Sequence, residues 1–227
     1  GDPARGRRDR LMLLVMARHG NTFEAGETPV FVGAKEDLPL TEAGLEQSRQ
    51  IGRALRDAGL LPDRVLAGPL KRTRTGARLA AEACGFSGEV EIEARLREID
   101  YGAWGGKSDA EIVEAWGDRA LADWRERNIA PAGAGWSPAP SELAANAESL
   151  FQSLTRDRDP ARIVLAVTSN GVLRYFHSLM TGDSAAPEQA KVKTGRLCAA
   201  RIDTGGVTPV CWNAPAEAGS LHPGAAR

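Results

Sequence analysis

The sequence predicts an α/β fold, a three-layer α/β/α sandwich around a mainly parallel central sheet. Short apolar runs typical of buried strands alternate along the chain with longer segments whose apolar residues follow helical spacing. This alternation favours a mainly parallel sheet that is covered by helices on both faces. At 227 residues, the chain is long enough to bury a substantial core within one domain.

The strands are expected at Leu11–Ala17, Arg64–Ala67, Val90–Ala94, Arg162–Thr168, Leu197–Ile202 and Val207–Trp212. The first helix is expected to run from a cap at Thr41 to Gly59, and the second from Pro69 to Gly85. Ser108 and Glu111 form a capping-box signature for a third helix. A fourth is expected from about Ser141 to Leu154, and a fifth after Gly171.

The predicted domain covers residues 11–212, between a polar leader and a weakly apolar tail. Residues 1–10 are interpreted as a leader or a cloning remnant. Within about residues 104–140 we expect a lid or insertion, because the stretch APAGAGWSPAP is rich in proline, glycine and alanine. Residues 213–227 have few apolar side chains to bury and are expected to form a flexible tail.

The composition narrows the classes of partner. The 29 basic and 30 acidic residues nearly cancel, which argues against a global attraction to nucleic acid or to an anionic membrane. Three cysteines without metal-type spacing fit reduced thiols and a cytoplasmic protein. The apolar run LMLLVMA at residues 11–17 is too short to span a bilayer and is expected to be a core strand.

The stretch ARHGNT, residues 17–22, follows the first predicted strand and could bind and attack a phosphate. The planar guanidinium of Arg18 suits phosphate oxygens, and a neutral ring nitrogen of His19 can act as a nucleophile. Gly20 allows the backbone to approach an anion closely, and Thr22 adds a hydroxyl donor. By itself this stretch is weak support for a phosphate site, since a loop with one solvated arginine would have the same sequence pattern.

Three further motifs follow in order: GAKEDLPLTEAGLEQ at residues 33–47, GPLKRTRTGARLA at 68–80 and LREIDYGAWGG at 96–106. With Arg-His-Gly, this ordered set resembles the histidine phosphatase superfamily, also called the phosphoglycerate mutase-like family. The resemblance covers roughly residues 15–174 and implies that residues 11–212 form a histidine phosphatase domain with the phosphoglycerate mutase-like fold.

The resemblance also implies roles for individual residues. His19 matches the nucleophile that forms a phosphohistidine, and Glu98 matches the proton donor to the leaving oxygen. Two guanidinium groups would neutralise the phosphoryl oxygens, which is where such catalysis gains most. Glu98 should have a raised pKa, because a carboxyl group must be protonated in order to donate. The phosphate-binding set is Arg18, Arg72, Asn170, Thr22, Asn21 and Gly171.

Structural alternatives exist for several of these residues. Arg72 could be one more charge on a solvated helix face, and Glu98 could be a surface carboxylate, with Asp100 competing for its role. Three motif residues more readily set a loop and a helix cap than perform chemistry: Asp37, Pro39 and Thr41. Four tryptophans could wall a pocket, although packing is the commoner role, and no role is assigned to them: Trp104, Trp116, Trp124 and Trp136.

One signature is altered after the fourth predicted strand. The family carries Ser-His-Gly where this chain reads Ser169-Asn170-Gly171. His177 cannot easily replace the missing histidine, because two helical turns place it about 10 Å further along the axis. A neutral amide donates a weaker hydrogen bond, and losing a strong oxyanion donor costs about 3–4 kcal/mol. A natural active variant, an engineered substitution and a phosphate-binding protein with little catalysis all remain open.

The sequence thus predicts a phosphatase that hydrolyses a small-molecule phosphate monoester through phospho-His19. A phosphoglycerate-mutase-type phosphotransferase and a weakly active phosphate-binding or regulatory protein are the alternatives. No cofactor or metal is expected, because fixed cations supply the charge and no metal-ligand spacing occurs. The expected partner is a small phosphorylated metabolite, not nucleic acid or membrane. The identity of that substrate and the formation of a homodimer are left open.

Overall fold

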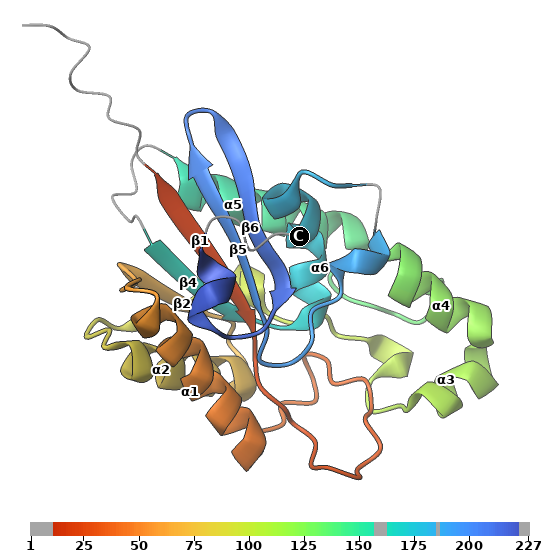
Figure 1. The fold of residues 1–227 in the computed structure, drawn as a ribbon. Coiled ribbons are helices and arrows are strands. Elements are labelled where there is room, and N and C mark those ends of the chain that lie inside the picture. The colour runs from red at the N-terminus through yellow and green to blue at the C-terminus, as the bar shows by residue number, and fades with distance from the viewer. Residues whose placement is uncertain (1–10, 157–162, 185–186, 223–227) are drawn as a thin grey trace, which may run out of the picture.

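The computed structural model describes residues 11–156, 163–184 and 187–222, and its centre is a six-stranded sheet (Figure 1). The strand order is β3-β2-β4-β1-β5-β6. The strands are β1 (Met12–Arg18), β2 (Arg64–Ala67), β3 (Val90–Ile92), β4 (Ile163–Thr168), β5 (Leu197–Asp203) and β6 (Gly206–Ala214). The pairs β1–β4, β4–β2 and β2–β3 are parallel. β5 is antiparallel to β1, and β6 is antiparallel to β5. The predicted α/β class with a mostly parallel sheet is confirmed.

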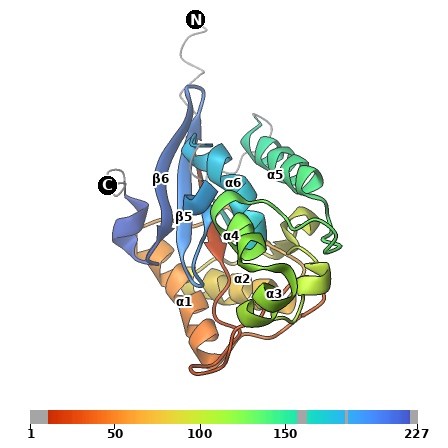
Figure 2. The ribbon, with the colours of Figure 1, turned by 90° about the vertical axis from the view of Figure 1, so that its right-hand side faces the viewer.

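Helices cover both faces of the sheet. The helices of the described residues are α1 (Glu42–Asp57), α2 (Lys71–Cys84), α3 (Asp109–Trp116), α4 (Asp118–Arg127), α5 (Pro140–Thr155) and α6 (Asn170–Thr181). Short 3-10 turns lie at Ala94–Leu96, Gly102–Trp104, Pro187–Ala190 and Ala218–Leu221. α1 and α2 lie on one face of the sheet, and α5 and α6 lie on the other (Figures 1 and 2). The leader, residues 1–10, falls outside the described residues.

The helix ends agree closely with the capping residues in the sequence. The Thr41 side chain accepts a hydrogen bond from the Gly44 N–H at the start of α1, and α3 begins with the predicted capping box. α2 begins at Lys71, two residues later than Pro69 suggested. Asp37 Oδ1 accepts a hydrogen bond from the Lys71 N–H, so this motif aspartate serves as a helix cap, as expected.

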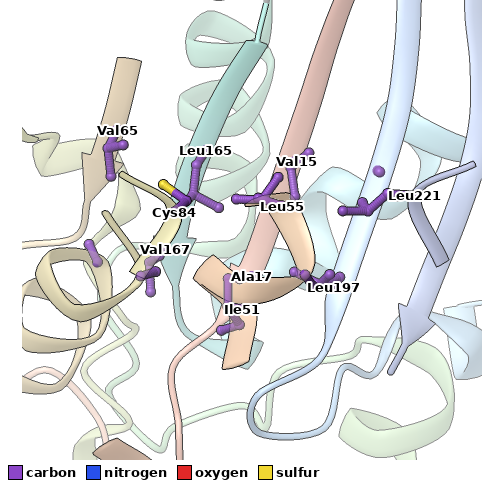
Figure 3. Packing of buried hydrophobic residues seen from close by; sticks show 14 of the residues in the cluster. Val15, Ala17, Ile51, Leu55, Val65, Cys84, Leu165, Val167, Leu197 and Leu221 are labelled. Carbon is purple, nitrogen blue, oxygen red and sulfur yellow. The ribbon is translucent and has the colours of Figure 1, made fainter. Parts of the chain in front are cut away.

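Side chains of the central strands alternate between two cores. Along β1, Leu13, Val15 and Ala17 pack toward α1 and α2, where Figure 3 shows Val15 beside Leu55 and Ala17 beside Ile51. Met12, Leu14 and Met16 point the other way, toward α5 and α6. Because both faces of the sheet are buried, the strands read as continuous apolar runs.

The region at residues 104–140 contains two helices, α3 and α4, of which the sequence predicted only α3. Gly117, with a φ of 82°, separates the two helices. Figure 1 places this helix pair to the side of the sheet, next to α6. The aromatic side chains here pack edge to face with one another, which is the packing role weighed for the tryptophans: Phe31, Tyr101, Trp104, Trp116, Trp124 and Trp136.

The segment predicted as a flexible tail differs from that expectation in its described part. β6 continues to Ala214, and a short turn at Ala218–Leu221 follows. Leu221 is buried in the core beside α1, where Figure 3 shows it pointing toward the sheet. Ala214 and Ala216 pack against the same core, and burying Leu221 removes its apolar surface from water, which stabilises this segment. Residues 223–227 lie outside the described residues.

Candidate active site

The backbone of the central strands positions His19. β1 ends at Arg18, and the His19 N–H donates to the Thr168 carbonyl at the end of β4. The Gly195 N–H contacts the carbonyl oxygens of Arg18 and His19 at 3.2 Å each. His19 therefore lies at the carboxyl end of the parallel strands, where ligands of such sheets collect.

The ring of His19 is arranged as a neutral nucleophile. The side chain is buried, and Nδ1 lies 2.7 Å from the Gly20 carbonyl oxygen. Because a carbonyl oxygen can only accept, Nδ1 carries the proton and the lone pair is on Nε2. Burial, followed by the charges of Arg18 and Arg72, lowers the pKa of His19 well below its usual value. The imidazole is therefore neutral at physiological pH.

Arg18 lines the same cavity as His19. One guanidinium nitrogen donates to the Val192 carbonyl at 2.8 Å, which fixes the side chain. Its Nε is buried without a hydrogen-bond partner among the described residues. Burial lowers the pKa of Arg18, although the group remains a cation, as arginine does in proteins. A phosphoryl group could accept hydrogen bonds from the remaining donors.

Glu98 is buried in the wall of the cavity, so the alternative that it is a surface carboxylate is wrong. Burial raises its pKa, even though Arg72 and Arg18 favour the charged form. Its two oxygens accept from the N–H groups of Ile99, at 2.9 Å, and Gly171, at 3.3 Å. The raised pKa is the property that a general acid needs near neutral pH.

Gly171 contacts the Glu98 carboxyl group, and a side chain at this position would displace that group. A Cβ at this position would lie 2.2 Å from Glu98 Oε1 and 2.6 Å from the Tyr101 hydroxyl oxygen. The Gly171 N–H donates to Glu98. The anion that this amide contacts in the structure is therefore the carboxylate, whereas the sequence predicted a phosphoryl group.

Arg72 is fully buried, so a solvated helix face is not its environment. Its terminal nitrogens donate to the carbonyl oxygens of Val32, Gly33 and Glu36 at 3.0–3.1 Å. Arg72 is not among the described residues that line the cavity, but its charge acts on Glu98 and His19. Arg72 therefore ties the loop at residues 32–36 to α2, and its positive charge acts on the cavity from behind the wall.

Asn170 is the first residue of α6 and lines the cavity. Its Oδ1 accepts from the Val192 N–H at 2.8 Å, which leaves the amide nitrogen as the free donor. Ser169, immediately before it, is the N-cap, and its buried hydroxyl has no partner within the described part of the chain. Ser169 was not among the predicted site residues. Two polar side chains, Ser169 and Asn170, therefore follow β4 in the stretch where the altered family signature is predicted.

Asn21 and Thr22 also line the cavity, on the loop that follows His19. The Asn21 carbonyl accepts from the Thr41 N–H, and its side-chain oxygen accepts from the Thr194 hydroxyl. The loop passes so close to α1 that a Cβ on Gly44 would lie 2.2 Å from the Asn21 carbonyl oxygen. These contacts hold the predicted phosphate loop against the helix terminus.

The cavity has a volume of about 850 Å³, which is far larger than a phosphate group requires. Its wall beyond the predicted residues includes four groups that the sequence analysis did not predict: Tyr101, Arg125, Arg174 and Lys191. Tyr101 belongs to the motif at residues 96–106, whereas Arg125, Arg174 and Lys191 lie on separate elements that meet only in the folded chain, outside any quoted motif. Within the described residues, no cluster of three or more histidine, cysteine or acidic side chains could hold a metal ion. In the same residues, no helix is long and apolar enough to cross a bilayer.

Similar proteins share both the sequence pattern and the architecture. A 2,3-bisphosphoglycerate-dependent phosphoglycerate mutase from Thermobifida fusca is 32% identical over 178 residues, which cover 76% of this chain and 69% of the relative. The corresponding mutase from Streptococcus gordonii is 31% identical over 168 residues, covering 73% and 71%. The Parvibaculum lavamentivorans relative is 35% identical over 124 residues, covering 53% of this chain and 58% of its own length.

Solved structures with low identity share the fold. A mycobacterial glucosyl-3-phosphoglycerate phosphatase superposes with a TM-score of 0.73 at 23% identity, covering 90% of this chain and 99% of its own. An α-ribazole phosphatase from Shigella flexneri superposes with a TM-score of 0.70 at 23% identity, covering 89% and 96%. The family model for the histidine phosphatase superfamily (branch 1) matches residues 14–215. The chain therefore belongs to the histidine phosphatase superfamily.

Proposed function

We propose that this chain is a phosphatase that hydrolyses a small-molecule phosphate monoester through a phosphohistidine at His19. One observation carries the proposal: a neutral histidine and a buried carboxyl group with a raised pKa line the same cavity as Arg18. Nucleophile, acid and cation are the three groups that metal-free phosphoryl transfer requires.

In the first step, the lone pair on His19 Nε2 attacks phosphorus, and the bond from phosphorus to the ester oxygen breaks. The Nδ1–H remains bonded to the Gly20 carbonyl, which stabilises the positive charge that develops on the ring. Arg18 neutralises the phosphoryl oxygens, with an amide donor from Asn170 and the electrostatic field of Arg72.

Glu98 supplies the proton that the departing alkoxide needs, because burial keeps its carboxyl group protonated to a higher pH than usual. In the second step, water attacks the phosphohistidine and gives a proton to the Glu98 carboxylate. Orthophosphate leaves, and both residues return to their starting protonation states. In this scheme, Gly171 positions Glu98 for the reaction.

A mutase is the second candidate, because the curated relatives described above are named phosphoglycerate mutases. In a mutase, a second hydroxyl group in place of water would resolve the phosphohistidine. The related structures include phosphatases, and the fold alone does not separate the two activities.

The test is a panel of phosphate monoesters with release of orthophosphate as the readout, on wild type and on His19→Ala. We expect turnover in wild type and a loss of more than about 10³-fold in His19→Ala, since even a single oxyanion donor is worth 10²–10³. His222→Ala, which changes an exposed histidine, is the matched control. Acid-labile labelling of wild type by a ³²P-ester should disappear in His19→Ala.

Turnover that survives His19→Ala would refute the proposal. Chasing labelled enzyme with water alone or with an added alcohol or hydroxy acid separates phosphatase from mutase. If label appears in the added acceptor and little orthophosphate forms, the mutase is the correct assignment.

A further inference from the structure

The cavity continues beyond the groups that the proposed reaction uses. The continuation is lined by residues from three elements: Arg125 near the end of α4, Arg174 on α6 and Lys191 just after the 3-10 turn at Pro187–Ala190. We call these three residues the distal cluster. Arg18 lines the same cavity from the end of β1.

Lys191 is held next to the phosphoryl end by its neighbour in the chain. The Val192 N–H donates to Asn170 Oδ1, and the Val192 carbonyl accepts from Arg18. The backbone on the C-terminal side of Lys191 is therefore tied to two predicted phosphate-binding residues. Because Lys191, Arg18 and Asn170 line one cavity, a single ligand that fills the cavity would contact both Lys191 and the phosphoryl end.

The ammonium group of Lys191 makes no salt bridge within the described part of the chain. Burial lowers its pKa, and the largest charge effects on it are repulsions from Arg125, Arg18 and Arg174. A cation that is partly desolvated among other cations is destabilised until an anion binds. Lys191 therefore brings free donors to the distal cluster.

The two arginines of the distal cluster are held by protein groups. Arg174 is buried, stacks 4.9 Å from the Trp124 ring centre, and donates to the Trp124 and Arg125 carbonyls and to Asn128 Oδ1. Arg125 pairs with Asp109 at 2.5 Å. Arg174 thus holds the end of α4 and adds positive potential, and its Nε is buried without a hydrogen-bond partner in the described part of the chain.

Four acidic residues also line the cavity: Glu24, Glu27, Glu98 and Asp109. The carboxyl groups of three of them have partners in the protein. Asp109 pairs with Arg125, and Glu98 is bonded to the backbone at the phosphoryl end. Glu27 accepts from the Glu24 N–H within the loop after His19. None of these four is among the largest charge effects on Lys191.

We propose that Lys191, supported by Arg125 and Arg174, forms a second anion subsite, and that the substrate is a phosphate monoester with a further anionic group. A carboxylate and a second phosphate share the required chemistry. The proposal rests on the proposed phosphatase function for the identity of the first group. It adds a selection step, in which Lys191 favours esters that carry a second negative charge.

The experiment compares two esters that differ at one carbon: 3-phosphoglycerate, with a carboxylate, and glycerol 3-phosphate, with a neutral CH2OH. We expect wild type to prefer 3-phosphoglycerate in kcat/KM, and Lys191→Gln to reduce this preference about tenfold or more, as a lost charge-assisted hydrogen bond requires. Most of the loss should appear in KM. A second pair, 1,3-propanediol bisphosphate and its monophosphate, shows whether phosphate serves as well as carboxylate.

Lys193→Gln is the matched control, because it removes the same charge two residues away from a side chain that is exposed and outside the cavity lining. The preference should remain in Lys193→Gln. Equal losses in both variants would mean that only the general field matters, and a wild type without preference would overturn the subsite.

The phosphatase function and the anion subsite can be tested separately. If no ester is hydrolysed in a His19-dependent way, the phosphatase assignment fails, and the subsite is then tested by calorimetry on the wild-type chain. Tighter binding of 3-phosphoglycerate than of glycerol 3-phosphate, with a difference that depends on Lys191 and not on Lys193, supports the subsite. Equal binding of the two esters refutes it.

Discussion

The two ends of the cavity are built in different ways. At the phosphoryl end, backbone contacts between the ends of β1 and β4 position His19, and backbone amides hold the buried Glu98. At the distal end, the cluster consists of side chains from α4, α6 and the segment at residue 191, and its members Lys191 and Arg125 reach solvent.

The difference supports the proposed division, in which the phosphoryl end performs chemistry and the distal end selects the substrate. Groups that are held by strand ends and buried amides keep their geometry and perturbed pKa values, as catalysis requires. A cluster carried on helices outside the sheet can change without disturbing the sheet, because substitutions there leave the central core intact. We therefore expect variants at the phosphoryl end to change kcat and variants at the distal end to change KM or stability.

The largest effect is expected from Glu98→Gln, which removes the proton donor at the phosphoryl end. For an alkyl phosphate, kcat should fall by about 10²–10⁴-fold, the usual contribution of general acid–base catalysis. For p-nitrophenyl phosphate the fall should be much smaller, because nitrophenolate leaves without a proton. Steady-state kinetics on the two esters measures the difference.

Asp100→Asn is the control for Glu98→Gln, because Asp100 was the competing carboxylate. A hydrogen bond from Lys35, 2.8 Å away, lowers the pKa of Asp100, so that this group is ionised and cannot donate a proton. The kcat of Asp100→Asn should stay near that of wild type. An equal loss in the two variants would contradict the assignment of Glu98.

Glu98 also gives the first step of the proposed reaction a pH dependence. The Glu98 pKa is raised by burial, so kcat for an alkyl ester should fall as pH rises through it, and this limb should vanish in Glu98→Gln. The linked stability has the same sign: protonated Glu98 contributes to the free energy of unfolding at low pH, and this contribution is lost as pH rises through the raised pKa. The stability of Glu98→Gln relative to wild type should therefore increase with pH.

The second prediction tests the donor at the end of β4. Asn170→His should raise kcat by up to about 10²-fold, because a charge-assisted donor to the phosphoryl oxygens replaces a neutral amide. Ser169→His, made in parallel, tests whether the neighbouring position is the one that faces the phosphoryl group. If kcat rises in neither variant, this position of the wild-type site is adapted to its neutral residues, and the predicted cost is wrong.

The third and smallest effect concerns the distal end. Arg174→Met keeps a long side chain beside Trp124 but removes the guanidinium group with its three hydrogen bonds, so the free energy of unfolding should fall by about 2–3 kcal/mol. KM should rise more than kcat falls. Denaturant unfolding and kinetics on 3-phosphoglycerate measure the two effects.

Arg127→Met provides the comparison for Arg174→Met. Arg127 is on α4 and forms an exposed pair with Asp123, which is worth less than about 1 kcal/mol. Equal destabilisation by the two variants would show that Arg174 has no special role in holding α4.

Much of the fold and of the phosphoryl end was predictable from the sequence. Strand-like runs and helix caps are local patterns, and each of the six expected strands has a counterpart in the sheet. His19 and Glu98 were found because they belong to motifs that are continuous in the sequence. Parallel strands bring their carboxyl ends to one edge of a sheet, so motifs that follow such strands meet there.

The sequence by itself determined the family pattern, the strand and helix periodicity and the identity of the residues at the phosphoryl end. Tertiary structure alone decided that Arg72 donates to three carbonyls, that Gly171 contacts Glu98 and that Lys191 lies beside the two arginines of the distal cluster. Each of these pairs joins residues at least 17 positions apart in the chain, with the Gly171–Glu98 pair separated by 73. Local propensities carry no information about such pairs, because their proximity results from the packing of the whole chain.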